Sequence, residues 1–431
     1  MSSSDPSVQR PKILIASLGT RGDVQPYVSL ARALHAEGAE VVLATGEGFD
    51  DMIRAAGARP LVLPINYQTL LGSTSMREAL FSLRGMIQAA RDTTRLQQEV
   101  AETLYRETLS EKPDLILFNV KAATITIAAR KLGVPALPTC LQPILAATSD
   151  YPIALFGLPN LGSIGNRASW WAFRKLFYLG IGHLMKFMTG LTGEDHKKRG
   201  DLVDGFDPSG GAVLSLQGYS SALVPNASDW PAHVRSTGYW FTEPDAHYSP
   251  PPELAAFLES GPPPIYVGFG SMPSKDPQGF TQMILTGLER GASRAILSTG
   301  WGGLAPHDLP ETLRSRVHVL EKAPHSWLFP KCAAIVHHGG SGTTHEALRW
   351  GKPSFISPVF GDQPFWGKQV ATIGAGPAPI KQKHLTAETF AQALKDLEQP
   401  TYRQNAEKAA SVMAGEPGAA GTARMLIKTY L

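Results

Sequence analysis

The pattern of apolar and polar positions predicts a first series of strands that alternate with helices. An apolar run over residues 12–17 leads through a Gly-rich turn into a helix with apolar positions Val28, Leu30, Ala31 and Leu34. Further strands are expected at residues 40–44, 61–64 and 114–118, with a long helix over residues 93–109. Such alternation builds a parallel sheet with helices on both faces, so the first half of the chain predicts a Rossmann-like lobe.

A second alternating series occupies the other half of the chain. Its strands are expected at residues 265–269, 294–298, 318–321, 334–337 and 354–357, with helices over residues 279–290 and 418–431. Between the two series the alternation stops over residues 141–211, and prolines cluster over residues 223–264. We therefore predict these parts: an N-terminal lobe over residues 1–225 with a lid segment at 141–211, a linker over 226–264, a C-terminal lobe over 265–415, and a helix over 416–431 that can return to the N-terminal lobe.

Composition narrows the class of protein. A chain of 431 residues exceeds what one hydrophobic core usually supports. The 43% of hydrophobic and 18% of charged residues argue against disorder and against a coiled coil. Because 40 basic and 37 acidic residues leave a formal net charge of +3, the total charge predicts no nucleic-acid partner.

The two cysteines and the lengths of the apolar runs indicate where in the cell the protein is expected. Cys140 and Cys332 lie far apart in different predicted lobes, which argues against a disulfide framework and a thiolate metal site. The first ten residues are polar and do not resemble a signal peptide, and no later run is long enough to span a membrane. We expect a cytoplasmic protein, with a peripheral membrane contact as the only membrane association.

Residues 335–346 carry the most specific chemistry. An apolar strand runs into the sequence HHGGSGTTHE at residues 337–346, which continues as a helix. Backbone N–H groups at a helix start favour a phosphate, and small residues let a diphosphate approach the backbone. By itself such a turn serves packing as often as function, so the neighbouring motifs decide.

The next strand end supplies a second motif, with GKP at residues 351–353 and GDQP at residues 361–364. The run over residues 338–363 resembles the donor-binding signature of UDP-glycosyltransferases, which has a His, a Gly-rich turn, a Glu, a Gly-x-Pro and an Asp-Gln pair. Plant members have Trp and Gln upstream, where Lys322 and His325 stand here. The resemblance implies the GT-B fold, an α/β architecture in which two Rossmann-like lobes with parallel sheets face a central cleft.

The same resemblance implies a donor contact for each matching residue. Diphosphate contacts are His338, Ser341, Gly342 and Thr343, with Ser271 as a further phosphate contact; Glu346 binds the ribose, Asp362 and Gln363 bind sugar hydroxyls, and Gly22, Ala323 and Gly340 complete the donor-binding set. A neutral His or a hydroxyl can donate to phosphate oxygens, and a carboxylate can accept from vicinal hydroxyls. His338 could instead be a buried histidine of the core, and Asp362 could instead cap a helix. For His337 we expect such a structural role.

The turn GTRGDVQP at residues 19–26 ends the first strand. It resembles the Gly-Ser/Thr-Arg-Gly-Asp-Val-x-Pro loop of sterol glucosyltransferases and bacterial antibiotic glycosyltransferases, in which the Asp is the general base. The resemblance therefore makes Asp23 the base that takes the acceptor proton, with His338 as the second catalytic residue. The alternative is that Asp23 only caps the following helix. A dinucleotide fingerprint is disfavoured because Gly-x-Gly-x-x-Gly is absent.

One base and a good leaving group are enough for direct displacement, so we expect inversion and a β-glucoside product. The favoured donor is UDP-glucose, bound as a substrate. Helix-start N–H groups and His338 can meet the charge of the leaving diphosphate, and the sequence contains no cluster of metal ligands. No metal and no other cofactor is therefore expected.

The acceptor is expected to be a lipophilic, hydroxylated small molecule. Resemblance to the sterol glucosyltransferase branch extends along nearly the whole chain, as in PDLIL at residues 113–117 and TGYWF at residues 237–241. It implies a sterol-like acceptor and assigns Gln142, Trp171 and Phe360 to its binding. Alternatives are a polyketide, flavonoid or other aromatic acceptor with a UDP- or TDP-sugar, a sugar-nucleotide epimerase, and a non-catalytic binding protein.

The aromatic and basic segment over residues 170–188 has two interpretations. It could lie on a membrane surface. It could also be a core-facing helix that roofs the acceptor pocket, which we prefer because apolar stripes on helices usually face a core.

Overall fold

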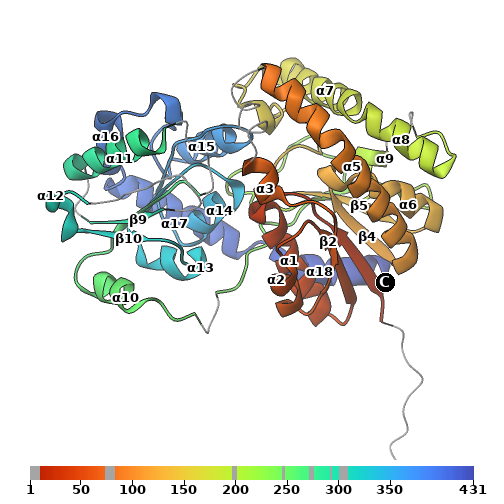
Figure 1. The fold of residues 1–431 in the computed structure, drawn as a ribbon, viewed down its shortest axis with the longest axis horizontal. Coiled ribbons are helices and arrows are strands. Elements are labelled where there is room, and N and C mark those ends of the chain that lie inside the picture. Colours follow the sequence, from red (N-terminus) through yellow and green to blue (C-terminus); the bar gives the residue numbers. More distant parts are fainter. Residues whose placement is uncertain are drawn as a thin grey trace, which may run out of the picture.

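Two α/β lobes, each built on a parallel sheet, form the structure (Figure 1). It is a computed structural model that describes residues 10–72, 83–196, 201–244, 248–270, 276–291, 294–299 and 309–431. The two predicted alternating series are both present, and the predicted fold class is confirmed.

The first lobe contains a seven-stranded sheet in the order β3-β2-β1-β4-β5-β6-β7. Its strands are β1 (Lys12–Ala16), β2 (Glu40–Thr45), β3 (Arg59–Val62), β4 (Leu115–Asn119), β5 (Ala136–Cys140), β6 (Ser215–Gln217) and β7 (Val234–Ser236). Its sheet is flanked by α1 (Arg21–Ala36), α2 (Asp50–Ala55), α3 (Tyr67–Gly72), α5 (Leu83–Glu111) and α6 (Ile125–Leu132). All neighbouring strands pair in parallel.

Burial on both faces explains why the strands of the first lobe are continuous apolar runs. In β1, Ile13 and Ile15 belong to one hydrophobic cluster, and Leu14 and Ala16 belong to the cluster on the opposite face. Helices therefore cover both sides of the sheet, as a parallel sheet requires. The predicted apolar positions of α1 are all buried in the first of these clusters.

The lid segment is helical where alternation stops. It contains α7 (Gly162–Gly180), α8 (Gly182–Thr192) and α9 (Asp201–Asp204). Within its described residues, the one β interaction is an isolated antiparallel bridge from Phe206 to Ala136. On α7, Trp170 is buried and its Nε1 donates to the carbonyl oxygen of Tyr151 at 2.9 Å, which fastens α7 to the loop that follows β5 within the same segment.

The second lobe contains a five-stranded sheet in the order β10-β9-β8-β11-β12. Its strands are β8 (Ile265–Gly268), β9 (Ala295–Ser298), β10 (Val317–Leu320), β11 (Ala334–His337) and β12 (Ser354–Ile356). Its helices include α10 (Pro252–Glu259), α11 (Pro277–Gly291), α12 (Glu311–Arg314), α13 (His325–Leu328), α14 (Ser341–Arg349), α15 (Gln363–Thr372), α16 (Ala387–Asp396) and α17 (Pro400–Ala414).

The stretch predicted as a linker, residues 226–264, is divided between the lobes. Strand β7 lies inside it and is the edge strand of the first sheet, and Trp240 is fully buried in the core of the first lobe. Leu254 of α10 is buried in the second lobe. The prediction of a linker over the whole stretch was therefore wrong. A strand of only three residues is too short to show an alternating pattern of apolar and polar positions, and the prolines around it are typical of turns.

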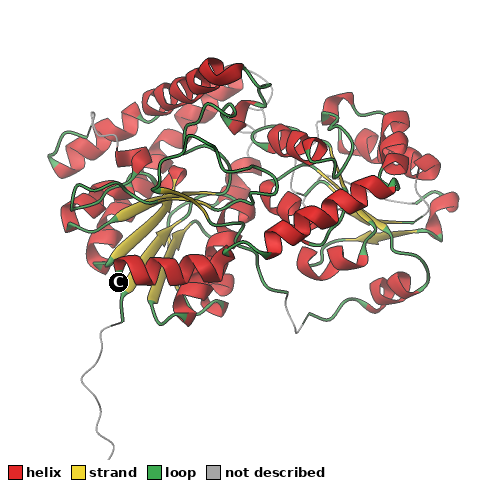
Figure 2. Ribbon diagram, turned by 180° about the vertical axis from the view of Figure 1, so that it is seen from behind, coloured by secondary structure: helices red, strands yellow, loops and turns green. Residues whose placement is uncertain are grey.

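The C-terminal helix α18 (Gly418–Tyr430) packs on α1 of the first lobe, next to its sheet. Figure 2 shows α17 and α18 following one another from the second lobe to the first. The Nε1 of Trp240 donates to Thr422 Oγ1 at 3.3 Å, and the N–H of Gly418 donates to the carbonyl of Thr237 at 2.7 Å. The chain thus connects the lobes twice.

His345 of α14 joins the two lobes directly. Its Nδ1 lies 2.7 Å from the Ser341 carbonyl oxygen, and its Nε2 accepts the Ser220 N–H at 3.1 Å. These two bonds require the neutral ring with its proton on Nδ1. The ring also stacks on Tyr239, with 4.4 Å between the ring centroids. In addition, the Ser341 hydroxyl donates to the Leu141 carbonyl of the first lobe at 2.9 Å.

We predict that His345→Ala lowers the free energy of unfolding by about 2–4 kcal/mol, because it removes a buried ring and leaves the Ser220 N–H without its acceptor. Chemical denaturation measures the change. The exposed His384 provides the control, since His384→Ala removes a ring that contributes no buried surface. Equal stability of both variants would contradict the role of His345 at the lobe interface.

Candidate active site

A small cavity lies where three strands of the first lobe end. Its volume is about 20 Å³, and it contains Asp23 after β1, Asn119 and Lys121 at the end of β4, and Gln142 after β5. Carboxyl ends of parallel strands are where α/β proteins bind ligands. The structure therefore brings the predicted base and the predicted acceptor residue Gln142 together.

Asp23 is anchored on both of its oxygens. Its Oδ2 accepts from the N–H of Thr20 at 2.9 Å and from the Thr20 hydroxyl at 3.2 Å, while Oδ1 accepts from Lys121 Nζ at 2.9 Å. Gly19 permits this geometry, since its φ is +144° and a Cβ there would lie 2.1 Å from Asp23 Oδ2. The capping alternative is thus present in the structure, and it occupies Oδ2.

Sequence reasoning did not select Lys121 as a site residue. The signal available was its position directly after the buried strand β4, the neighbour of β1 in the sheet. Adjacent parallel strands end at the same edge, so a polar residue there faces the turn that carries Asp23. A lone Lys after a strand is otherwise ordinary surface chemistry.

The turn from β11 into α14 brings the second lobe's polar groups close together. A Cβ at Gly340 would lie 2.7 Å from His338 Nε2, and a Cβ at Gly339 would lie 2.9 Å from the Gln363 carbonyl oxygen. Gly339 also has φ of +93°, in the region that favours glycine. The first-turn N–H groups of α14, at Ser341, Gly342 and Thr343, are those that a helix leaves without intrahelical partners. This turn can accept a diphosphate.

His338 and His337 differ in their hydrogen bonds. His338 Nδ1 and His337 Nε2 are both buried and have no hydrogen-bond partner within the described residues, but His337 Nδ1 accepts the Gly339 N–H at 3.1 Å. Burial lowers the pKa of His338 to about 4, and it also holds the pKa of His337 well below its ordinary value. His338 is therefore neutral near pH 7 and can donate one hydrogen bond. His337 has the structural environment that was expected.

The predicted carboxylate contacts of the second lobe are bonded within their own helices. Glu346 Oε1 accepts from Trp350 Nε1 at 2.7 Å, and Asp362 Oδ2 accepts from Trp366 Nε1 at 2.8 Å. Asp362 stands at the N-cap position of α15, yet its side chain makes no capping bond. Its capping alternative is therefore wrong in this structure.

Burial raises the pKa of both carboxyl groups, Glu346 and Asp362. For Asp362 the charge of Asp23 acts in the same direction, and Lys121 acts against it. Helix α1, which carries Asp23, contacts α14 across the interface, and α15, which follows Asp362, contacts Ala154–Phe156 of the first lobe.

The remaining predicted residues vary in their placement. Gln363 is buried, and its Oε1 accepts the N–H of Val359 at 2.8 Å, so that oxygen shapes the loop before α15. Phe360 lies in that loop and is 36% exposed. Gly22 lies in the first turn of α1 and Ala323 just before α13. Ser271 lies outside the described residues.

Trp171 was expected to bind the acceptor, but the structure does not bring it to the cavity. It is 65% exposed on the outer side of α7, beneath the Nζ of Lys175 at 5.4 Å from its ring centroid. Its neighbour Trp170 faces inward instead. Consecutive residues on a helix point about 100° apart, so only one of the two can face the core.

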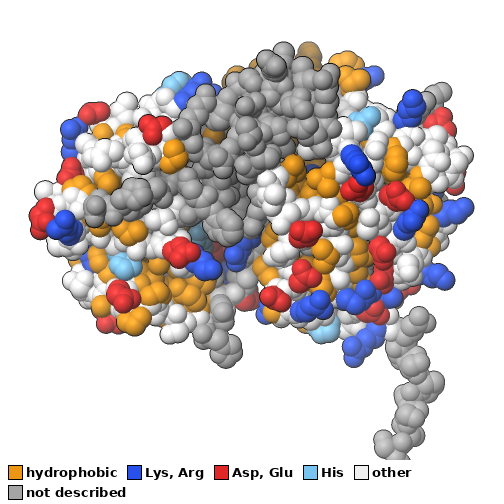
Figure 3. Space-filling model, viewed as in Figure 1, with side chains coloured by type: hydrophobic (Ala, Val, Ile, Leu, Met, Phe, Trp, Pro, Cys, Tyr) orange, Lys and Arg blue, Asp and Glu red, His pale blue; other side chains and the backbone are white. Residues whose placement is uncertain are grey.

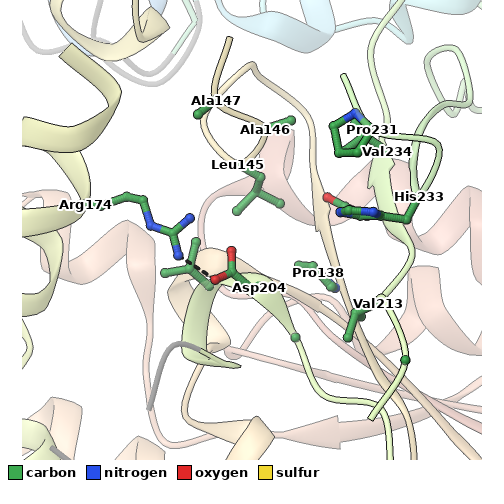
Figure 4. A pocket seen from close by; sticks show the side chains of 14 residues that line it. Pro138, Leu145, Ala146, Ala147, Arg174, Asp204, Val213, Pro231, His233 and Val234 are labelled. Atoms are coloured by element: carbon green, nitrogen blue, oxygen red, sulfur yellow. Dashed lines mark hydrogen bonds and ion pairs between the residues drawn. The ribbon is translucent and has the colours of Figure 1, made fainter. Parts of the chain in front are cut away.

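A larger cavity of about 490 Å³ lies on the lid side of the first lobe (Figure 4). Arg174 and Asp204 form an ion pair at its edge, and Pro138, Leu145 and His233 contribute to its walls. It shares no lining residue with the Asp23 cavity. We therefore locate the candidate site at Asp23, because α1, which carries this residue, contacts α14 of the second lobe, although that cavity is much smaller.

Among the described residues, no group of three or more His, Cys, Asp or Glu side chains is arranged to hold a metal ion. No described helix has the length and apolar content needed to cross a membrane. On the face shown in Figure 3, basic and acidic side chains are interspersed over both lobes, without a field of one sign.

The fold and its interface site define a protein of the GT-B class. Solved structures with this fold include the glycosyltransferase of kitacinnamycin, with 18% identity, a TM-score of 0.73 and coverage of 98% of this chain and 100% of that one. The calicheamicin glycosyltransferase CalG4 has 18% identity, a TM-score of 0.71 and coverage of 98% and 99%.

Sequence comparisons identify the family. The glycosyltransferase family 28 N-terminal domain matches residues 13–136, and the erythromycin biosynthesis protein CIII-like C-terminal domain matches residues 306–429. Two sterol 3-beta-glucosyltransferases of Arabidopsis thaliana are 31% and 33% identical over 97% and 96% of this chain, which spans 65% and 67% of their lengths. One from Aspergillus fumigatus is 30% identical over 89% of this chain, which spans 27% of it.

The chain therefore belongs to the UDP-glycosyltransferase family, in the branch of the sterol 3-beta-glucosyltransferases and bacterial antibiotic glycosyltransferases. It spans about two thirds of the length of the plant relatives and about a quarter of the fungal one.

We predict that stability falls as pH decreases from 6.5 to 4. Burial holds the pKa of His325, His338 and His345 at about 4, below the ordinary 6.5, so the unfolded chain binds more protons in this window. Each such histidine adds up to about 1.4 kcal/mol per pH unit to the slope. The raised pKa of Asp362 acts in the opposite direction.

Urea denaturation at pH 4.5 to 7 measures this slope. His338→Gln should reduce it by up to one histidine's share, whereas His384→Gln, at an exposed position, should leave it unchanged. A slope in the His338 variant equal to that of the wild type would show that this ring has the same pKa in the folded and the unfolded protein.

Proposed function

We propose that the protein transfers glucose from UDP-glucose to a hydroxyl of a sterol-like acceptor, with inversion at the anomeric carbon. The observation that carries this proposal is the contact of α1, which carries Asp23, with α14 of the other lobe, whose start is suited to a diphosphate. Family membership supports glycosyl transfer, and the names of the curated relatives support a sterol.

In this proposal Asp23 acts as the general base. The acceptor oxygen forms a bond to the anomeric carbon, its proton passes to Asp23 Oδ1, and the bond from that carbon to the diphosphate oxygen breaks. Thr20 holds the other oxygen, and Lys121 orients Oδ1 in the cavity. A base fixed on one oxygen loses little freedom when it takes the proton with the other.

The leaving diphosphate gains charge, and the second lobe supplies donors for it. The N–H groups at the start of α14 and the neutral His338 ring can donate to its oxygens. We propose that these donors suffice without a metal. Asp362 and Gln363 hold the sugar hydroxyls, and Glu346 holds the ribose, with Trp350 and Trp366 keeping the two carboxylates in place.

A sterol-like acceptor is preferred to a polyketide, flavonoid or other aromatic one because the sterol enzymes match 96% or more of this chain at above 30% identity in the two plant proteins. The antibiotic glycosyltransferases share its fold at 18% identity. An epimerase would need acid and base groups around the sugar but no acceptor lid. We also propose a cytoplasmic location, in agreement with two free, buried cysteines.

We predict that Asp23→Asn lowers kcat about a hundredfold or more at saturating acceptor and leaves the UDP dissociation constant within about twofold. An amide oxygen can still accept the capping bond, so the melting temperature should change little. Asp51→Asn, at an exposed position of α2, is the matched control. Near-normal turnover of the Asp23 variant would exclude it as the base.

We predict that the product is a β-glucoside, because displacement from an α-linked UDP-glucose by one base comes from the opposite face. A matrix of UDP-glucose, UDP-galactose and TDP-glucose against sterols and flavonoids, followed by mass spectrometry, identifies the substrate pair. Proton NMR of the product then measures the anomeric coupling constant, which is large for the β-anomer. An α-product would overturn the assigned role of Asp23.

A further inference from the structure

The outer side of α7 carries an unusual share of the exposed apolar side chains. Ten large hydrophobic residues are exposed in the described part of the chain, and five of them lie on α7 or directly before it. They are Leu161, Ile164, Trp171, Leu176 and Leu179, with exposed fractions of 47%, 88%, 65%, 57% and 79%. Exposed apolar residues scattered singly are normal, whereas a group on one element marks an interaction surface.

These side chains form one stripe. Ile164, Trp171, Lys175 and Leu179 follow one another at spacings of seven, four and four, which keeps them on the same side of a helix. The opposite side holds the buried Asn166 and Trp170. Helix α7 therefore packs one side against the core of the lid and leaves the other side exposed. The first side fits the interpretation as a core-facing helix, and the second side is available for a surface contact.

The charge around the stripe is positive. Residues 151–193 contain no Asp or Glu. Within them, Arg167 and Arg174 pair with Asp229 and Asp204 from elsewhere in the lobe. Lys175 and Lys186 are exposed and have no acidic partner among the described residues, and His183 is hydrogen-bonded to Gln97.

We propose that this stripe, Ile164, Trp171, Lys175 and Leu179, with Leu176 at its edge, docks on an anionic lipid surface. Apolar side chains and a Trp enter the boundary of the acyl chains, and lysines extend to the anionic headgroups. Positive charge without acidic neighbours favours such a surface over an acid-bearing protein partner. Figures 1 and 2 show α7 and α8 along the outer edge of the first lobe, where a planar surface can reach them.

The inner side of the same helix holds the loop that follows β5. Trp170 bonds to Tyr151, and Gln142 earlier in this loop lines the Asp23 cavity. If the proposed function holds, a lipophilic acceptor dissolved in the bilayer would reach the site from the side on which the lid docks. The docking itself rests on the stripe alone and can be tested without any transfer reaction.

Vesicle co-sedimentation of the full chain tests the proposal. We expect binding to vesicles of phosphatidylcholine mixed with phosphatidylserine, weaker binding to phosphatidylcholine alone, and loss of binding as salt is added. The double variant Ile164→Glu, Leu179→Glu should bind the anionic vesicles about tenfold or more weakly. Lys175→Gln with Lys186→Gln should lower the preference for the anionic vesicles.

The matched control is Val412→Glu, which changes a 47% exposed apolar residue on α17 of the other lobe. It should bind vesicles as the wild type does. Calorimetric UDP binding by each variant shows that it is folded. Two results would overturn the proposal: equal binding by the double variant and the wild type, or a wild type that ignores anionic vesicles and instead forms a dimer that the double variant abolishes. Neither result depends on whether the protein transfers glucose.

Discussion

The start of α14 is held against the first lobe by side chains of the helix itself, and the site depends on that contact. His345 accepts from Ser220 while it donates to its own helix, and the Ser341 hydroxyl donates to the Leu141 carbonyl. Both residues lie within the run that carries the donor motif. The helix start that can receive a diphosphate is therefore positioned by the same side chains that hold the two lobes together. Burial lowers the pKa of His345 to about 4, so its ring is neutral near pH 7.

Each lobe contributes a carboxylate to the candidate site, Asp23 from the first lobe and Asp362 from the second. Asp23 combines two roles that compete for a carboxylate in many proteins, since one oxygen closes the capping box of α1 and the other faces Lys121 and the cavity. Asp362, on the opposite lobe, is oriented by Trp366 and not by a cap. Asp23 is held on both oxygens, by Thr20 and by Lys121, and Asp362 is held on Oδ2 by Trp366. Side chains held in this way need less ordering when a substrate binds.

The lid has a different construction from the rest of the fold. The central strands of both sheets, such as β1, β4, β8 and β11, are buried along nearly their whole length, whereas α7 is buried on one side and carries apolar residues on the other. Such a helix is costly to expose unless something covers it. If α7 docks on a lipid surface with its outer side, the acceptor would arrive on that side. The inner side of α7 is bonded through Trp170 to the loop after β5, which lines the Asp23 cavity.

The sequence by itself determined the two alternating series, the buried face of α1, and the motifs at three strand ends, because each depends on local periodicity or on glycines that only a close backbone approach requires. It predicted Asp23 and Gln142, and the structure brings these two together. It missed Lys121, the strand β7 within the supposed linker, and the outward direction of Trp171. These were decided by tertiary structure alone, because which neighbour a strand end faces, whether three residues pair with an edge, and which of two adjacent tryptophans turns inward depend on contacts between segments far apart in the chain.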